Sequence, residues 1–430
     1  MSGTQPRPPL SLTRRRWRIP SALAHGDDVL EGLSVLDDVP GELGILLWQA
    51  LRDASLWAAA SPKARSGIFT ANAQANRMAA VLSAGVPLPL ERPLAVLARM
   101  AGSPEDAGEA NVALALREIS LWLDEHGRLG SALAYAHAAA MVAAGDAATA
   151  FIVGRLARRR AEYVRAATWF RRTAALARQS GDWPSYARAF MGLGQLYLQR
   201  GNLPVAYRFR RRALETTRRR GLDDLQGTAY HDLFEVAVHM GREGEAQEYA
   251  RQAFESYGWR HARVPMLAHD VAYFWMTTGG FERALAVFQA ILPHFDRTAD
   301  RVVVLSGVAR AAGGAGRPER FREAWAEVRG SLREVGEDNV AAVLLEGARG
   351  AISVGEWSLA EEAAQMAMDA AARRGEGHVR LAAEAVLDCA RRHGSLPSAG
   401  QPDAAPEMER AADCLAGDFV ESLRLVGSAA

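Results

Sequence analysis

The stretch LGQLYLQRGNLPVAY, residues 193–207, decides the fold. Apolar residues recur at helical spacing on both sides of a turn built on Gly201. Gly194 and Ala206 are small, as residues must be where two helices cross at close range. Asn202 follows the turn and is a residue type that caps helix N-termini. The stretch therefore predicts the centre of a helical hairpin.

Similar phrases recur along most of the chain. Aligned on their small residues, seven units begin at residues 113, 147, 187, 227, 265, 302 and 341, with spacings of 34 to 40 residues. A single hairpin cannot bury its own apolar face, so such units gain stability by stacking on their neighbours. The structural positions that define the repeat are Gly154, Gly194, Tyr197, Gly201, Ala206, Ala213, Gly241, Ala246, Ala284 and Ala360.

The pattern resembles the tetratricopeptide repeat family over residues 113–388. Several units of 37–40 residues exceed the family's usual length and are similar to repeats of some bacterial regulators. The resemblance implies an all-α, right-handed superhelical solenoid of about seven tetratricopeptide-like helical hairpins with helical N- and C-terminal caps. Arg210 departs from the pattern, which has an apolar residue there, and we expect Phe209 to compensate through a slight helix rotation.

Four segments follow from this repeat. Residues 1–40 form a flexible basic, proline-containing tail, and residues 41–112 a helical N-terminal cap without the repeat signature. The tetratricopeptide-like array occupies residues 113–392. Residues 393–430 hold a linker and a C-terminal helix, which either caps the last repeat or docks elsewhere.

Composition places the chain among soluble folded proteins. It has 49% apolar and 23% charged residues. The longest uncharged run, residues 129–145, is shorter than the roughly 20 residues of a membrane-spanning helix. The two cysteines, Cys389 and Cys414, match no metal or redox spacing and fit a reducing compartment. We expect a cytoplasmic protein that does not associate with membranes.

Catalytic signatures are absent from the sequence. We find no nucleotide-binding glycine loop, nucleophile elbow or zinc-spaced cysteine pair. His231, Glu235 and His239 fall at i, i+4 and i+8 on one helix face, a spacing that could hold a divalent metal. The alternative, which we favour, is that they are polar residues on a solvated wall. The sequence therefore predicts a protein that is not an enzyme and uses no cofactor or metal.

Positive charge is concentrated in one part of the chain. Residues 147–220 contain 17 arginines and three acids, a net charge of +14, although the whole chain carries only +1. We expect this basic patch on second helices and turns. It could bind nucleic-acid phosphates or an acidic protein, or remain solvated. Its members are Arg158, Arg159, Arg160, Arg171, Arg172, Arg211, Arg212, Arg218, Arg219 and Arg220.

The family resemblance also implies a concave groove lined by the first helices of successive repeats. Arginine at its entrance, followed by histidine and tyrosine, suits an extended peptide with acidic character, because arginine grips carboxylates in a bidentate manner. The alternative is that a solvated groove must be lined by polar residues of some kind. The groove residues are Arg117, Phe151, Arg155, Arg188, Gln195, His231, Glu235, His269, Tyr273 and Arg310.

Three functions are compatible with the sequence. The leading hypothesis is a non-enzymatic scaffold or adaptor that engages a protein segment or peptide through the concave groove. The second is a peptide-responsive regulator whose superhelix changes curvature and controls an effector on another chain. The third is a nucleic-acid-binding accessory subunit that uses the basic patch at 147–220. Partner identity, conformational switching and oligomeric state stay open.

Overall fold

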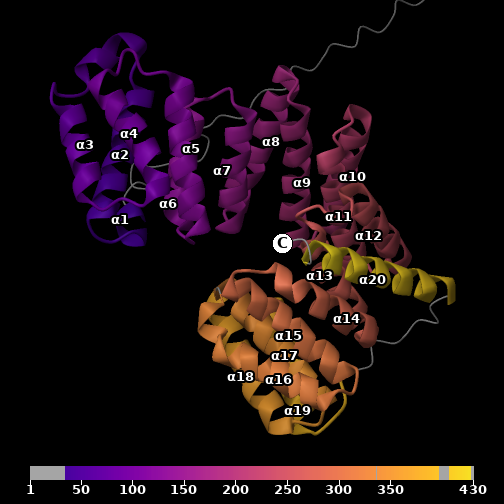
Figure 1. Cartoon of the computed structure of the whole chain (residues 1–430). Helices are drawn as coiled ribbons and strands as arrows, with labels where there is room; N and C mark the ends of the chain where they lie inside the picture. The colour runs from indigo at the N-terminus through magenta and orange to yellow at the C-terminus, as the bar shows by residue number, and fades with distance from the viewer. Residues whose placement is uncertain (1–33, 336, 397–405, 428–430) are drawn as a thin grey trace, which may run out of the picture. The chain divides into compact units, whose positions relative to one another are not determined.

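The computed structural model describes residues 34–335, 337–396 and 406–427. Within these ranges the chain forms twenty α-helices and no β-strand (Figure 1). None of the described helices is both long and apolar enough to cross a membrane. The predicted all-α class is confirmed.

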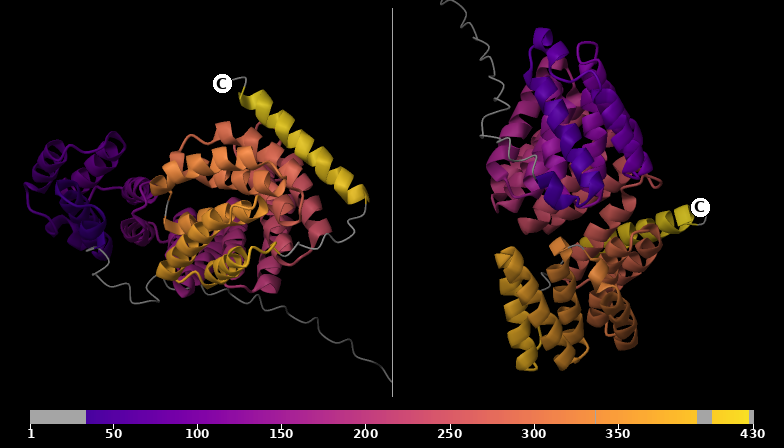
Figure 2. Two further views of the ribbon diagram at one scale, coloured as in Figure 1. Left: turned by 90° about the horizontal axis from the view of Figure 1, so that it is seen from below. Right: turned by 90° about the vertical axis from the view of Figure 1, so that its left-hand side faces the viewer.

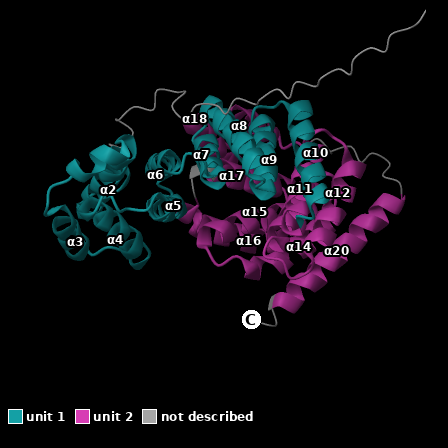
Figure 3. Cartoon of the chain, turned by 90° about the horizontal axis from the view of Figure 1, so that it is seen from above, with its two compact units in different colours: residues 1–222 teal, residues 223–430 magenta. Residues whose placement is uncertain are grey.

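Contacts divide the chain into two compact units, residues 1–222 and 223–430 (Figure 3). In the first unit a cap precedes three helical hairpins. The cap helices are α1 (Ser34–Asp38), α2 (Glu42–Ala59), α3 (Ala73–Ser83) and α4 (Leu88–Gly102). The hairpins are α5 (Glu109–Glu125) with α6 (Leu129–Val142), α7 (Ala147–Arg159) with α8 (Tyr163–Ser180), and α9 (Trp183–Gln199) with α10 (Leu203–Arg220).

The second unit contains four hairpins and two further helices. The hairpins are α11 (Asp223–His239) with α12 (Glu243–Tyr257), α13 (Val264–Thr277) with α14 (Phe281–Ile291), α15 (Thr298–Gly314) with α16 (Pro318–Gly330), and α17 (Glu337–Ser353) with α18 (Trp357–Arg374). The further helices are α19 (Gly377–Arg391) and α20 (Pro406–Gly427). Each of the seven predicted repeat units coincides with one hairpin, which confirms the helical-repeat architecture.

Local chemistry accounts for the α9–α10 hairpin. Asp182 accepts a hydrogen bond from the Ser185 amide at the start of α9, and Asn202 accepts one from the Val205 amide at the start of α10. Gly201 has a φ of 72°, which glycine adopts without strain. The turn and the cap between the two helices therefore lie at Gly201 and Asn202, where the sequence predicts them.

Arg210 occupies its buried position without help from Phe209. Its side chain is fully buried, and a Cβ added to Gly194 would lie 2.6 Å from the Arg210 Cγ. The guanidinium donates a hydrogen bond to the Gln195 amide oxygen. Phe209 instead lies half-buried, with its ring stacked on Tyr197. The expected compensation by helix rotation is wrong, because Gly194 leaves room for the arginine stem.

The N-terminal cap begins before residue 41. Helix α1 lies within the range expected to be a flexible tail, and its Val35 is fully buried. The Asp38 carboxylate accepts hydrogen bonds from both the backbone amide and the hydroxyl of Ser131 on α6. Helices α2, α3 and α4 lie within the predicted cap of residues 41–112. Residues 1–33 of the predicted tail lie outside the described residues.

The C-terminal helix docks in the middle of the second unit. Helix α19 packs on α17 and α18 at the end of the array, whereas α20 contacts α12, α13 and α14 (Figure 2). The fully buried Phe419 of α20 contacts the rings of Phe254 and Trp275. Arg283 of α14 pairs with Glu409 and Asp413 of α20. Of the two expected positions for this helix, the structure has the docked one.

Candidate binding cavity in the second unit

The first helices of the four hairpins in the second unit line a cavity of about 350 Å³. This volume lies at the lower end of the roughly 300–1,000 Å³ typical of ligand pockets. Each of α11, α13, α15 and α17 contributes apolar side chains or backbone to it. The apolar lining comprises Phe234, Val238, Phe274, Val303, Gly307, Ala342 and Val343. The polar lining comprises Glu235, His239, His269, Asp270, Tyr273, Thr277, Ser306, Asn339 and Glu346.

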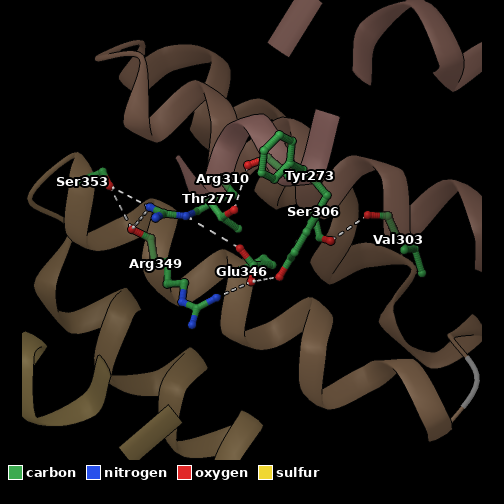
Figure 4. Close-up of polar contacts among 9 residues, drawn as sticks. Tyr273, Thr277, Val303, Ser306, Arg310, Glu346, Arg349 and Ser353 are labelled. Carbon is green, nitrogen blue, oxygen red and sulfur yellow. Dashed lines mark hydrogen bonds and ion pairs between the residues drawn. The ribbon is translucent and has the colours of Figure 1, made fainter. Parts of the chain in front are cut away.

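A polar network around Glu346 forms one side of the cavity (Figure 4). The Tyr273 hydroxyl donates to the Glu346 Oε1 atom at 3.0 Å, so a bond from α13 reaches α17. Arg349 donates to the same oxygen at 2.6 Å, and the Nε atom of Arg310 lies 3.7 Å from Oε2. Arg310 also donates to the Ser353 hydroxyl. One carboxylate thus holds together three of the four first helices.

Burial and charge shift the titration of this network. The negative charge of Glu346, followed by burial, raises the pKa of the Tyr273 hydroxyl well above its ordinary value. Burial lowers the pKa of Arg310, although the charge of Glu346 opposes the change. The tyrosine is therefore a stable hydrogen-bond donor near neutral pH, and the glutamate accepts hydrogen bonds from Tyr273 and Arg349 and forms an ion pair with Arg310.

A second polar cluster joins α11 to α13. Nε2 of His231 lies 2.9 Å from Oδ2 of Asp270, and Nδ1 of His269 lies 3.0 Å from Oδ1 of the same carboxylate. Burial acts to raise the pKa of Asp270, but the hydrogen bonds and charges of the two histidines outweigh it. The pKa of Asp270 therefore lies well below its usual range. This carboxylate stays ionised and fixes both imidazole rings.

Five of the predicted groove residues lie in the second unit. Glu235, His269 and Tyr273 line the cavity. His231 is turned to Asp270, and Arg310 is largely buried behind Glu346.

Sequence reasoning missed Asp270 and Glu346. Each occupies the sixth position of its repeat unit, one residue past the positions assigned to the groove wall. An acid at that position in three of the four units of this half of the chain (Asp232, Asp270 and Glu346) was the available signal.

The other five predicted groove residues lie in the first unit, which is described separately. Arg155 forms an ion pair with Asp124 at 2.8 Å, and Arg117 lies 3.6 Å from Asp146. The remaining three differ in their surroundings: Phe151 lies against Phe170, Gln195 holds Arg210, and Arg188 is exposed. Gln195 is therefore committed to an internal hydrogen bond.

The metal alternative is not supported. No group of three or more His, Cys, Asp or Glu side chains among the described residues is arranged to hold a metal ion. His239 is exposed at the end of α11, whereas His231 faces Asp270 on the neighbouring helix. Helical spacing predicts that the two histidines share one face of α11. In the structure, however, the imidazole of His231 forms its hydrogen bond with Asp270 of the next hairpin.

The predicted basic patch lies wholly in the first unit but is not uniform. Arg172 is buried and donates to the Ala144 carbonyl, so its assignment to an exposed patch is wrong. Arg159 and Arg160 pair with Asp124 and Glu162 respectively. Arg158 is half-buried. Arg171 donates a hydrogen bond to the Tyr197 hydroxyl, and the guanidinium of Arg220 lies over the Trp183 ring. The exposed members that remain are Arg211, Arg212, Arg218 and Arg219.

No protein-family model matches the chain, and no curated protein matches it. The chain is similar to the solved Rap conjugation gene regulator of plasmid pLS20 in complex with the Phr* peptide, at 14% identity over 80% of this chain and 96% of that chain, with a TM-score of 0.48. It is also similar to the TPR2AB domain of yeast Sti1 in its complex with pHSP90, at 14% identity over 66% and 99% of the two chains, with a TM-score of 0.28.

A third similar structure is the TPR domain of P58(IPK), at 12% identity over 74% of this chain and 97% of that chain, with a TM-score of 0.24. Two of these three structures are named for TPR, the tetratricopeptide repeat. Identities this low concern the fold alone, and the fold assignment rests on the seven hairpins described above.

Proposed function

We propose that this protein is a non-enzymatic scaffold that binds an extended protein segment or peptide in the cavity formed by α11, α13, α15 and α17. The cavity itself carries the proposal. It combines an apolar floor with a few fixed polar groups, which is the usual composition of a specific binding site. Its walls come from four successive hairpins, so a segment seated in it contacts several of them.

The lining favours a particular kind of segment. Phe234, Phe274 and Val343 offer an apolar floor that one large apolar side chain of the ligand can fill. Carboxylates outnumber free cations around it, because Arg310 and Arg349 are already engaged by Glu346. We therefore propose an apolar anchor flanked by hydrogen-bond donors or basic groups in this cavity, and not the acidic segment that arginines in the first unit suggested.

Substitution at the cavity tests the proposal. A displayed library of random 12-residue peptides is selected on the full chain, and the affinities of the selected peptides are measured by calorimetry. Ala342 is exposed and lines the cavity, so Ala342→Trp fills the space without disturbing the core. We expect at least a tenfold loss of affinity. Ala326→Trp, at an exposed position of α16 away from the cavity, is the control. Equal affinity of both variants would overturn the proposal.

The bond between Tyr273 and Glu346 favours the regulatory version of this function. It links α13 to α17 across α15, and both residues line the cavity. A ligand that takes over either group breaks this link and frees the two hairpins to move. We expect peptide binding to speed up amide hydrogen exchange in α13 and α17. The variant Tyr273→Phe, which lacks the hydrogen bond to Glu346, should show the same faster exchange in the absence of peptide. If hydrogen exchange is unchanged both on peptide binding and in Tyr273→Phe, the regulatory version is contradicted and the protein is a rigid scaffold.

A further inference from the structure

Apart from Arg220, which lies over the Trp183 ring, seven exposed arginines lie on the second helices of the last two hairpins of the first unit. We name this set the α8–α10 arginine face: Arg171, Arg178, Arg208, Arg211, Arg212, Arg218 and Arg219. Two of its pairs, Arg171 with Arg211 and Arg178 with Arg218, are 40 residues apart. This is the spacing between the repeat units that begin at residues 147 and 187, so the paired arginines occupy equivalent positions of neighbouring hairpins.

Positive charge on this face has too few acids nearby to balance it. Residues 163–222 contain 13 arginines and only two acids, Asp182 and Glu215, a net charge of 13 − 2 = +11. Asp182 is used as the cap of α9. Arg208, Arg218 and Arg219 make no hydrogen bond or ion pair to any described residue.

The exposed arginines at helix α12 of the second unit differ from these three. Arg242, the N-cap residue of α12, pairs with Glu245, and Arg251 within the helix pairs with both Glu248 and Glu255. Like charges that crowd one face repel each other and oppose folding. Arg208, Arg218 and Arg219 lack such partners, and their charge is therefore suited to an anionic partner outside the fold.

The partner chemistry follows from what else the face offers. Arg208 and Arg219 are eleven residues apart on α10, about 16 Å along the helix axis, which matches roughly five nucleotides of one strand at 3.4 Å each. Protein interfaces rely on large apolar anchors, but Val164 is the one exposed large apolar side chain on the described residues of α8 and α10. Contacts to phosphates need no such anchor. We propose that the α8–α10 arginine face binds the phosphate backbone of nucleic acid without sequence preference.

Salt dependence provides the decisive measurement. The full chain, purified through high salt and nuclease, is titrated onto a fluorescent 20-base-pair DNA duplex of arbitrary sequence and onto the matching RNA duplex. Anisotropy is followed at 50 to 200 mM salt. Each phosphate contact contributes about 0.9 to the slope of log affinity against log salt. The variant Arg208→Gln/Arg218→Gln/Arg219→Gln should therefore reduce the slope by about 2.7. Raising the salt over this range should cost the wild type about 40-fold more affinity than the variant.

A matched control keeps the result specific to this face. Arg297→Gln/Arg329→Gln/Arg333→Gln removes the same charge from exposed positions of the second unit and should keep the wild-type slope. Circular dichroism confirms that both variants are folded. Binding of either duplex with the expected slopes supports the proposal. The proposal is overturned if neither duplex binds at 50 mM salt, or if the slope of log affinity against log salt falls by the same amount in both variants. It is also overturned if a glutamate-rich peptide binds more tightly than both duplexes. Ala342→Trp should leave nucleic-acid binding unchanged, so this test is independent of the cavity.

Discussion

Gly194 and Arg210 depend on each other. The glycine leaves space at a helix crossing, and the arginine stem fills that space and carries its guanidinium to Gln195. A long basic side chain can be buried this way because its methylene groups cover apolar surface while its head keeps a hydrogen-bond partner. The arginine that looks misplaced in the repeat pattern is thus part of the packing.

Enlarging Gly194 should destabilise the first unit. In Gly194→Leu the new Cβ would meet the Arg210 Cγ at 2.6 Å, so the buried arginine must move. We expect the free energy of unfolding to fall by about 1–3 kcal/mol, the usual cost of overpacking. Urea denaturation followed by circular dichroism measures it. Gly145→Leu serves as the control, because a Cβ at Gly145 meets no atom within 4 Å. Similar losses in both variants would contradict the close packing described here.

Asp270 should make stability depend on pH in acid. Its pKa is lower in the folded chain than the roughly 3.9 of an unfolded aspartate, so the unfolded chain binds the proton more readily. The stabilisation is therefore complete at neutral pH and is lost progressively below about pH 5. Wild type should be more stable than Asp270→Asn at pH 7, and the difference should shrink towards pH 4. Urea unfolding at both pH values checks this. A difference that grows in acid would contradict the assignment.

At the level of elements, the hairpins could be predicted and the docking of α20 could not. A hairpin is specified within about 40 residues by caps, a glycine turn and small residues at the crossing, all of which can be read locally. The seat of α20 is formed by Phe254, Trp275 and Arg283, which lie more than 120 residues before their partners. An amphipathic helix reveals that it has an apolar face, but its sequence does not specify which surface it covers.

Truncating Phe419 should release α20. The ring is fully buried, and Phe419→Ala leaves a cavity whose cost is about 3–5 kcal/mol for a core phenylalanine. We expect faster amide hydrogen exchange throughout α20 and at the covered surface of α12 and α14. Leu425→Ala, at a side chain that is 49% exposed on the same helix, should have little effect. If exchange in α20 stays slow in Phe419→Ala, the ion pairs of Arg283 are what hold the helix.

At the level of the whole molecule, the chain is two separately organised stacks of hairpins. Each hairpin packs mainly on its sequence neighbours, as in other repeat proteins whose stability adds up locally. A fragment ending at Leu222 contains the complete first unit, from its cap to α10. We expect this fragment to be helical by circular dichroism and to unfold cooperatively in urea. A fragment that is unfolded on its own would show that the first unit needs the second.

The candidate site could be predicted only in part for the same reason. The repeat register assigned Glu235, His269 and Tyr273 to first helices, and these three side chains line one cavity. It did not reveal that Glu346 accepts a hydrogen bond from Tyr273, 73 residues earlier in the sequence. It also did not reveal that Asp270 forms a hydrogen bond with His231. Those pairings depend on how far neighbouring hairpins are rotated, which is set by packing between repeats and not by the spacing within one.

The docking of α20 also has a consequence for biosynthesis. The Ser422 hydroxyl donates to the Trp259 carbonyl, a contact between residues 163 positions apart. At a ribosomal rate of about 5–20 residues per second, the hairpins around Trp259 emerge roughly 8–30 s before the helix that covers them. During that interval the apolar seat of Phe419 is open to solvent and to other nascent chains. The second unit thus passes through a stage at which a chaperone could shield the surface that α20 later occupies.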